Sequence, residues 1–134
     1  MTHNRFFHPK FSIITVTYNA ETVLEDTIQS IVTQTYKNLE YIIIDGASKD
    51  KTMEIVNRYR DHIHTVISEP DQGLYDAMNK GLMQATGDYV CFLNAGDCLR
   101  EDDTLYLMVH ALNETQASDP AMPLPDVLYG ETAI

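Results

Sequence analysis

The chain has 134 residues, 44% of them hydrophobic, and its 20 acidic and 9 basic residues give a net charge of −11. This length and composition are typical of one globular domain with a single buried core. The negative charge repels a phosphate backbone, and no cluster of lysine and arginine offsets it locally, so we expect no nucleic-acid binding. No apolar stretch approaches the roughly 20 residues that cross a bilayer, so we expect no transmembrane segment.

Residues 1–10 lack the apolar run of a secretory signal and are expected to form a flexible arm. The only cysteines are Cys91 and Cys98, with no histidine nearby at the spacing of a zinc site. This cysteine usage indicates a reducing, cytoplasmic setting.

Strand-like and helix-like segments alternate along the rest of the chain. Residues 11–17 and 39–45 are continuous β-branched apolar runs, which are typical of strands buried on both faces. Weaker strand candidates follow at residues 64–69, 88–94 and 126–130. Apolar residues at three- and four-residue steps predict helices that contain residues 23–32, 53–59, 74–85 and 105–112. This order predicts an α/β domain whose mainly parallel sheet is flanked by helices, as in Rossmann-like folds.

Polar and turn-forming residues follow four of the expected strands, at residues 17–19, 45–48, 69–73 and 94–97. Ligands of open parallel sheets bind beyond the carboxyl ends of the strands, so these segments are the candidate site. The chain has no G-x-G-x-x-G after the first strand and no G-x-x-x-x-G-K-[ST], which excludes a typical dehydrogenase and a P-loop ATPase. A phosphoacceptor receiver domain is a weak alternative, because no lysine follows Lys80.

Four segments carry a resemblance to a known family: ITVTYNAE (14–21), YIIIDGASKDKT (41–52), SEPDQGLYDAMNKG (68–81) and ATGDYVCFLNAGD (85–97). They resemble the nucleotide-binding half of family 2 glycosyltransferases of the GT-A fold, in particular bacterial enzymes that build cell-surface polysaccharides. The resemblance implies transfer of a sugar from a nucleotide diphosphate sugar, commonly a UDP-sugar, to a glycan or lipid-linked acceptor. It also implies an inverting reaction in the cytoplasm or at the inner face of the membrane.

The resemblance further implies which residues bind the donor. Tyr18 presents its ring to the nucleobase, and Asp45 accepts a hydrogen bond from it. The alternatives are a core tyrosine for Tyr18 and an Asx turn or helix cap for Asp45. The implied nucleotide-sugar-binding residues are Thr17, Tyr18, Asn19, Asp45, Asp71, Ala95 and Gly96.

The expected helix after Gly73 departs from the wider family, which often has an arginine facing phosphate where this chain has Met78. Lys80 lies two residues further on and projects from a different side, so we expect it to be solvated. Asp76 is expected to compensate the helix dipole, because it lies in the first turn.

The metal motif departs as well. Many GT-A enzymes hold Mn²⁺ or Mg²⁺ with an Asp-x-Asp motif, because oxygen-ligated cations neutralise the leaving diphosphate. This chain has Asn94 and Gly96 at two of the usual acidic positions, which leaves Asp97 as the candidate ligand. The alternative for Asp97 is a cap of the following segment.

By resemblance, the general base of an inverting enzyme lies in an acceptor-binding half beyond Ile134. Residues 11–134 are therefore expected to be a nucleotide-sugar-binding domain truncated before that half, without a catalytic base of its own. The other hypothesis is a non-catalytic α/β module that binds a nucleotide or a partner.

Overall fold

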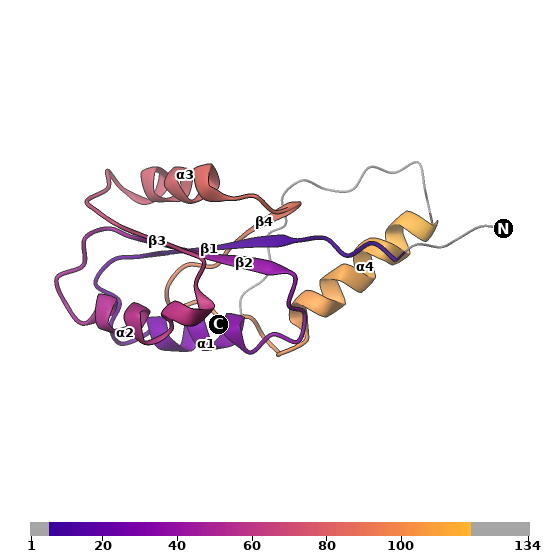
Figure 1. Ribbon diagram of the computed structural model, residues 1–134, viewed down its shortest axis with the longest axis horizontal. Coiled ribbons are helices and arrows are strands. Elements are labelled where there is room, and N and C mark those ends of the chain that lie inside the picture. The colour runs from indigo at the N-terminus through magenta and orange to yellow at the C-terminus, as the bar shows by residue number, and fades with distance from the viewer. Residues whose placement is uncertain (1–5, 119–134) are drawn as a thin grey trace.

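The computed structural model describes residues 6–118. Strands and helices alternate in it as the sequence predicts (Figure 1). The strands are β1 (Phe11–Thr17), β2 (Leu39–Asp45), β3 (Thr65–Ser68) and β4 (Tyr89–Phe92). The helices are α1 (Leu24–Val32), α2 (Thr52–Arg58), the short 3₁₀ helix η1 (Arg60–His62), α3 (Leu74–Gln84) and α4 (Thr104–Ser118).

The strands of the described region form one parallel sheet in the order β3-β2-β1-β4. The two strongest apolar runs, β1 and β2, are the central strands, which explains why they carry side chains buried on both faces. The predicted α/β fold is thus confirmed. The strand expected at residues 126–130 lies outside the described residues.

Side chains of β1 and β2 alternate between two cores, because successive residues of a strand face opposite sides of the sheet. Ile13 and Ile43 belong to the larger core, which is closed by α1, α2 and α4. Ile14 and Ile42 belong to the smaller core, where α3 lies alone on the opposite face (Figure 1).

α3 contacts the sheet through its smallest residues, Ala77 and Gly81. A Cβ atom on Gly81 would lie 2.5 Å from Cγ2 of Ile14, far closer than van der Waals contact. The absence of a side chain at this position therefore lets α3 approach β1 closely.

The core-facing side of α4 differs from the apolar set that the sequence suggests. Leu105, Val109 and Leu112 are buried, whereas Leu107 is 56% exposed. The segment contains apolar residues on several sides, so periodicity alone does not identify the side that packs.

The described part of the expected N-terminal arm, residues 6–10, makes specific contacts. The backbone N–H and C=O of Phe7 both bond the Asn113 side chain on α4. Pro9 is buried, and its carbonyl accepts a hydrogen bond from the Tyr36 hydroxyl. Side chains more than 25 residues away in sequence therefore hold this segment, which local composition does not reveal.

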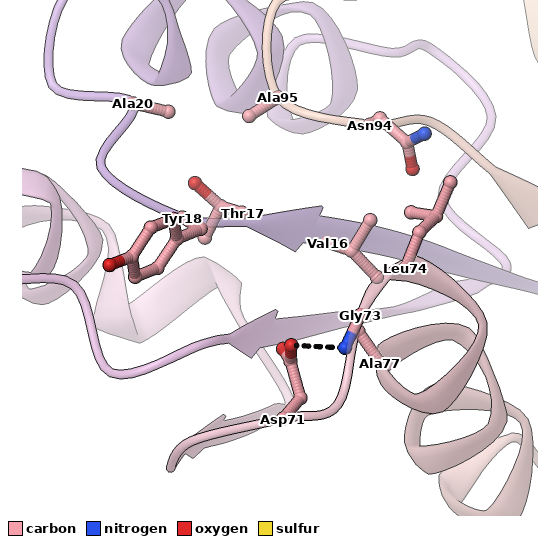
Figure 2. Close-up of a pocket in the computed structure, with 10 residues that line it drawn as sticks. All are labelled: Val16, Thr17, Tyr18, Ala20, Asp71, Gly73, Leu74, Ala77, Asn94 and Ala95. Carbon is pink, nitrogen blue, oxygen red and sulfur yellow. Dashed lines mark hydrogen bonds between the residues drawn. The ribbon is translucent and has the colours of Figure 1, made fainter.

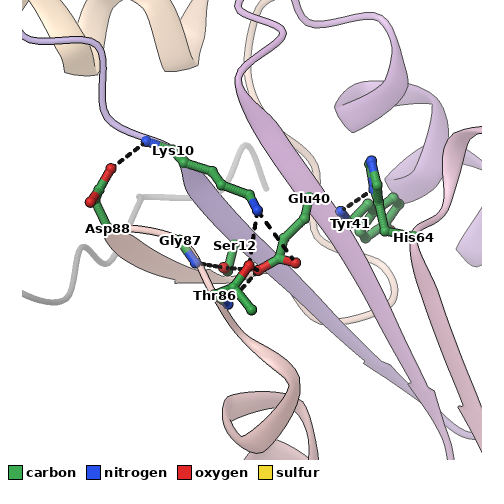
Figure 3. A network of polar contacts seen from close by, with 8 residues as sticks. All are labelled: Lys10, Ser12, Glu40, Tyr41, His64, Thr86, Gly87 and Asp88. Carbon is green, nitrogen blue, oxygen red and sulfur yellow. Dashed lines mark hydrogen bonds and ion pairs between the residues drawn. The ribbon is translucent and has the colours of Figure 1, made fainter.

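A buried carboxylate joins the amino ends of β1 and β2 to the segment after α3 (Figure 3). Glu40 is 7% exposed and accepts hydrogen bonds from the Ser12 hydroxyl and from the Thr86 backbone N–H and hydroxyl. The Lys10 ammonium lies 3.9 Å away. The network thereby fixes the C-terminal end of α3 against the sheet.

Candidate functional site

The carboxyl ends of the strands meet at one edge of the sheet, as predicted. Thr17, Asp45 and Ser68 lie in register at the ends of β1, β2 and β3. The backbone N–H of Ala95 donates to the carbonyl of Val16 and brings the segment after β4 to the same edge.

A first cavity of about 390 Å³ opens at this edge, between the end of β1, the start of α3 and the segment after β4 (Figure 2). Four of the predicted site residues line it: Thr17, Tyr18, Asp71 and Ala95. The other lining residues are Val16, Ala20, Gly73, Leu74, Ala77 and Asn94.

A second cavity, also of about 390 Å³, shares Tyr18 and Asp71 with the first. Its remaining lining residues are Gly46, Ala47, Lys49 and Pro70. A Cβ atom on Gly46 would lie 2.8 Å from Oδ2 of Asp71 and 3.4 Å from the Tyr18 ring. The glycine thus leaves room for the aromatic ring and the carboxylate to lie side by side between the two cavities.

Two oxygen atoms of residues that line the first cavity, Oγ1 of Thr17 and Oδ1 of Asn94, are buried and have no hydrogen-bond partner within residues 6–118. Figure 2 shows the Asn94 carboxamide oxygen pointing toward Leu74, while the Thr17 hydroxyl points to the side of Ala20 and Ala95. Buried polar atoms in native proteins are almost always paired, so these two are free to bond a ligand. Asn94 thus belongs to the site as an amide donor and acceptor. In the sequence, Asn94 stands out only as a departure from the Asp-x-Asp motif, which does not predict this role.

Asp45 lies behind the cavity wall and lines neither cavity. Its carboxylate is 0% exposed and accepts hydrogen bonds from the Ser48 N–H and hydroxyl and from the Ser68 hydroxyl. These contacts match the Asx-turn alternative, and they hold the turn that carries Gly46 and Ala47. The direct nucleobase contact that the resemblance implies for Asp45 stays a prediction.

Asn19 also helps to hold the loop after β2, which forms part of the second cavity. Its N–H donates to the Ser48 hydroxyl, and its Oδ1 accepts a hydrogen bond from the Lys49 N–H, each at 2.8 Å. Its φ of 48° lies in the left-handed region, which asparagine tolerates better than most residues. Asn19 thus joins the segment after β1 to the segment after β2.

Gly96 and Asp97 continue the loop past Ala95 and do not line the cavities. The Gly96 N–H donates to the Thr27 hydroxyl on α1, and its φ of 98° favours glycine. The Asp97 N–H donates to the Asn94 carbonyl, which closes a turn. This turn brings the Asp97 carboxylate and the Asn94 amide, two oxygen-bearing side chains, into one short loop.

Asp76 and Lys80 contact the loop before α3. Asp76 accepts a hydrogen bond from the Gln72 N–H, which fits its predicted location in the first turn of the helix. Lys80 is not solvated as expected: its side chain is 20% exposed and donates to the Pro70 carbonyl. The Lys80 side chain therefore reaches from α3 back to the loop before the helix.

Several lining residues are not recognisable from the sequence as site residues. Leu74 and Ala77 fit a helical apolar pattern, which predicts core packing equally well. Ala20 and Val16 carry no polar signal at all. The location of Leu74 immediately after Gly73 is the one available sign, since residues at the start of a helix after a strand face the ligand edge.

The model of the family described as "Glycosyl transferase family 2" matches residues 12–131. The chain belongs to this family. It is an α/β chain of the glycosyltransferase type with the GT-A fold, as the sequence predicts.

Curated relatives are named for polysaccharide and glycolipid synthesis. A "PGL/p-HBAD biosynthesis glycosyltransferase" of Mycobacterium bovis is 40% identical over 114 residues, which are 83% of this chain and 44% of the relative. A "Putative teichuronic acid biosynthesis glycosyltransferase TuaG" of Bacillus subtilis is 39% identical over 97 residues, covering 70% of this chain and 38% of the relative. The chain therefore spans less than half the length of these two relatives.

Solved structures show the same arrangement. A mannosyltransferase from Pyrobaculum calidifontis, solved with GDP-Man and Mn²⁺, superposes with a TM-score of 0.70 at 30% identity. The superposition covers 80% of this chain and 32% of that one. TarS of S. aureus, solved with UDP, has a TM-score of 0.69 at 28% identity, covering 78% of this chain and 32% of that one.

No helix in residues 6–118 combines the length and the apolar character needed to span a membrane.

Proposed function

We propose that this chain binds the nucleotide diphosphate sugar donor, a UDP-sugar, of a glycosyltransferase that builds a cell-surface polysaccharide. The acceptor is a glycan or a lipid-linked sugar, and the reaction takes place in the cytoplasm or at the inner face of the membrane. The observation that carries the proposal is the pair Tyr18 and Asp71, which lies between two cavities at the carboxyl edge of the sheet.

The chemistry of the pair suits a nucleoside. The Tyr18 side chain is 59% exposed, so its ring is accessible for stacking against a base. Within residues 6–118, the Asp71 carboxylate accepts a hydrogen bond from the Gly73 N–H alone, so it retains further acceptor capacity. A base N–H or a ribose hydroxyl can supply the missing donors. Thr17 and Asn94 offer two more acceptors deeper in the first cavity.

The diphosphate must avoid the negative charge of Asp71. The N-terminus of α3 borders the first cavity through Gly73 and Leu74, and the free N–H groups at a helix start favour an anion. The Gly73 N–H is already bonded to the Asp71 carboxylate, so we expect the phosphates to lie toward Leu74, at the first turn of α3, and the base to lie toward Gly46.

The relatives support a nucleotide-linked donor. TarS was solved with UDP and with UDP-GlcNAc, and the Pyrobaculum enzyme with GDP-Man. For this chain we favour uridine, because the donor implied by the resemblance to this family is commonly a UDP-sugar.

A divalent cation fits the loop after β4 only in part. No group of three or more acidic, histidine or cysteine side chains in residues 6–118 is arranged to hold a metal. Asp97 supplies one carboxylate, and the unpartnered Oδ1 of Asn94 is a further oxygen of the kind that Mn²⁺ and Mg²⁺ prefer. We propose that these two residues hold the ion together with donor phosphate oxygens. When bound, the ion would neutralise charge on the leaving diphosphate.

We also propose that the reaction inverts the sugar. An inverting reaction needs a general base to deprotonate the acceptor hydroxyl. We assign that role to a carboxylate outside the described residues, because each acidic residue at the site has a binding or structural contact instead.

Replacing Tyr18 with alanine should weaken UDP binding about 5- to 150-fold, because stacking of one base on an aromatic ring is worth about 1 to 3 kcal/mol. Isothermal titration of UDP into the 134-residue chain in Mn²⁺ measures this. Tyr18→Phe keeps the ring and should bind UDP nearly as the unsubstituted chain does. Tyr106→Ala, which removes an exposed tyrosine of α4, is the matched control. Equal affinity of Tyr18→Ala and the unsubstituted chain would contradict the proposed base site.

Metal and UDP should bind cooperatively at Asp97. One carboxylate and one amide are too few for an ion that takes about six oxygen ligands, so the diphosphate must complete the shell. Mn²⁺ should tighten UDP binding about 5- to 150-fold relative to EDTA, and UDP should tighten Mn²⁺ binding by the same factor. Asp97→Asn should abolish this coupling, whereas Asp61→Asn in η1 should keep it. If UDP binds equally well in EDTA and in Mn²⁺, the metal role of Asp97 is wrong.

A further inference from the structure

The ammonium group of Lys80 lies at the centre of a set of contacts that joins α3 to the loop before it. Its Nζ donates to the Pro70 carbonyl at 3.0 Å and lies 3.3 Å from Oε1 of Glu69 and 3.5 Å from Oδ2 of Asp76. Two of these partners belong to the segment that ends in Asp71, and the third is one helical turn away on α3. The lysine therefore bridges the helix and the loop.

The first residue of the loop is also held by the sheet, because the Glu69 N–H donates to the Asp45 carbonyl, but residues 70–73 have few other contacts. The Gln72 N–H donates to Asp76, and the Gly73 N–H donates to the Asp71 carboxylate within the loop itself. Gln72 and Gly73 are exposed. Gly73 has a φ of 107°, and glycine readily changes to other backbone conformations because it has no side chain. Asp76 is shared: the oxygen that bonds Gln72 also faces Lys80, so loss of the lysine loosens both contacts.

The charges around the loop add a second requirement. Glu69, Asp71 and Asp76 place three carboxylates within eight residues of one another beside a site proposed to bind a diphosphate. Burial alone would lower the pKa of Lys80, but the hydrogen bond to Glu69 and the charges of Asp76 and Glu69 raise it. Lys80 thus stays protonated near neutral pH and offsets part of the repulsion that these carboxylates exert on an anionic ligand.

We infer that Lys80 is a positioning residue of the donor site: it fixes residues 69–73 so that the Asp71 carboxylate stays between the two cavities. The inference rests on the proposed function and extends it to a residue that lines neither cavity. It also gives a role to the hydrogen bond between Lys80 and the Pro70 carbonyl.

The test compares three variants of the 134-residue chain: Lys80→Met, which keeps the aliphatic stem, Lys80→Arg, which keeps the charge and several donors, and Lys37→Met. Lys37 is exposed before β2, at the opposite edge of the sheet, so Lys37→Met is a control with the same net charge as Lys80→Met. UDP affinity in Mn²⁺ is measured by isothermal titration. Amide hydrogen exchange of Gln72 and Gly73 is measured by NMR without nucleotide, and urea unfolding verifies that each variant is folded.

Lys80→Met should weaken UDP binding about 5- to 10-fold, as expected for the loss of about one hydrogen bond to a charged group. It should also speed exchange of the Gln72 and Gly73 amides about fivefold or more, because both report local opening of the loop. Lys80→Arg should restore most of the affinity and the protection, and Lys37→Met should change neither.

Two outcomes overturn the inference: unchanged UDP affinity and loop exchange in Lys80→Met, or a Lys80→Arg variant that binds as weakly as Lys80→Met. The proposed function fails separately, if the unsubstituted chain binds neither UDP nor a UDP-sugar. In that case the exchange rates still decide whether Lys80 holds the loop.

Discussion

Replacement of Glu40 with alanine is expected to lower the free energy of unfolding by about 2 to 4 kcal/mol, because the buried Ser12 hydroxyl and two part-buried donors of Thr86 lose their acceptor at once. Glu40 accepts hydrogen bonds from the Ser12 hydroxyl and from the N–H and hydroxyl of Thr86 (Figure 3). The Gly87 N–H is bonded to the same Ser12 hydroxyl, so the whole connection between α3 and β1 is affected. Urea unfolding followed by circular dichroism measures the change.

Glu54→Ala, which removes an exposed glutamate of α2, is the control and should change the free energy of unfolding by less than about 0.5 kcal/mol. A Glu40→Ala variant as stable as this control would show that the network contributes little.

The pH dependence of stability provides an independent measurement on Glu40. Burial raises the pKa of this carboxyl, but the hydrogen bonds from Ser12 and Thr86 and the charge of Lys10 outweigh burial, so the pKa in the folded state is lowered. In the unfolded chain it returns to about 4.3. The stabilisation is therefore complete above about pH 4.3 and is lost as the pH falls through the folded-state value. Glu40→Gln should be less stable than the unsubstituted chain at pH 7 and should lose less on acidification.

Gly81→Ala is expected to destabilise the fold by about 1 to 3 kcal/mol, although alanine is the better helix former by about 1 kcal/mol. The new Cβ would lie 2.5 Å from Cγ2 and 3.2 Å from Cδ1 of Ile14, a buried side chain of the central strand β1. Relief of this overlap requires α3 to move away from the sheet. Because Leu74 and Ala77 of α3 line the first cavity, UDP affinity should fall together with stability.

A double-mutant cycle with Ile14→Ala distinguishes steric overlap from other effects. Ile14→Ala alone should cost about 2 to 5 kcal/mol, but Gly81→Ala should then add little, because the atoms it would strike are gone. Met83→Ala, which alters a side chain that is 84% exposed on the same helix, should be nearly neutral. Additive effects of Gly81→Ala and Ile14→Ala would contradict the close-packing explanation.

The order of strands and helices, the parallel sheet and the edge that carries the site follow from the sequence alone. The runs at residues 11–17 and 39–45 carry apolar residues on both faces, such as Ile13 and Ile14 or Ile42 and Ile43, and a central strand of a layered sheet buries both faces. Turn-forming residues after these strands mark the ligand edge, because parallel strands end together. The resemblance of residues 68–81 and 85–97 to the family is also visible in the sequence, because each motif consists of contiguous residues.

The detailed roles of the site residues depend on contacts between residues distant in sequence, which local patterns do not contain. The Asp45 carboxylate, for example, accepts a hydrogen bond from Ser68, 23 residues later, and this contact is not visible in the local motif. Lys80 is held by the carbonyl of Pro70, ten residues earlier in the chain. Residue type and helical spacing set which side chains can share a face, but only packing across the sheet decides which of those faces is buried. Packing across the sheet leaves Leu107 exposed and Val109 buried within the same helix, α4. It also places Leu74 and Ala77 of α3 at the first cavity.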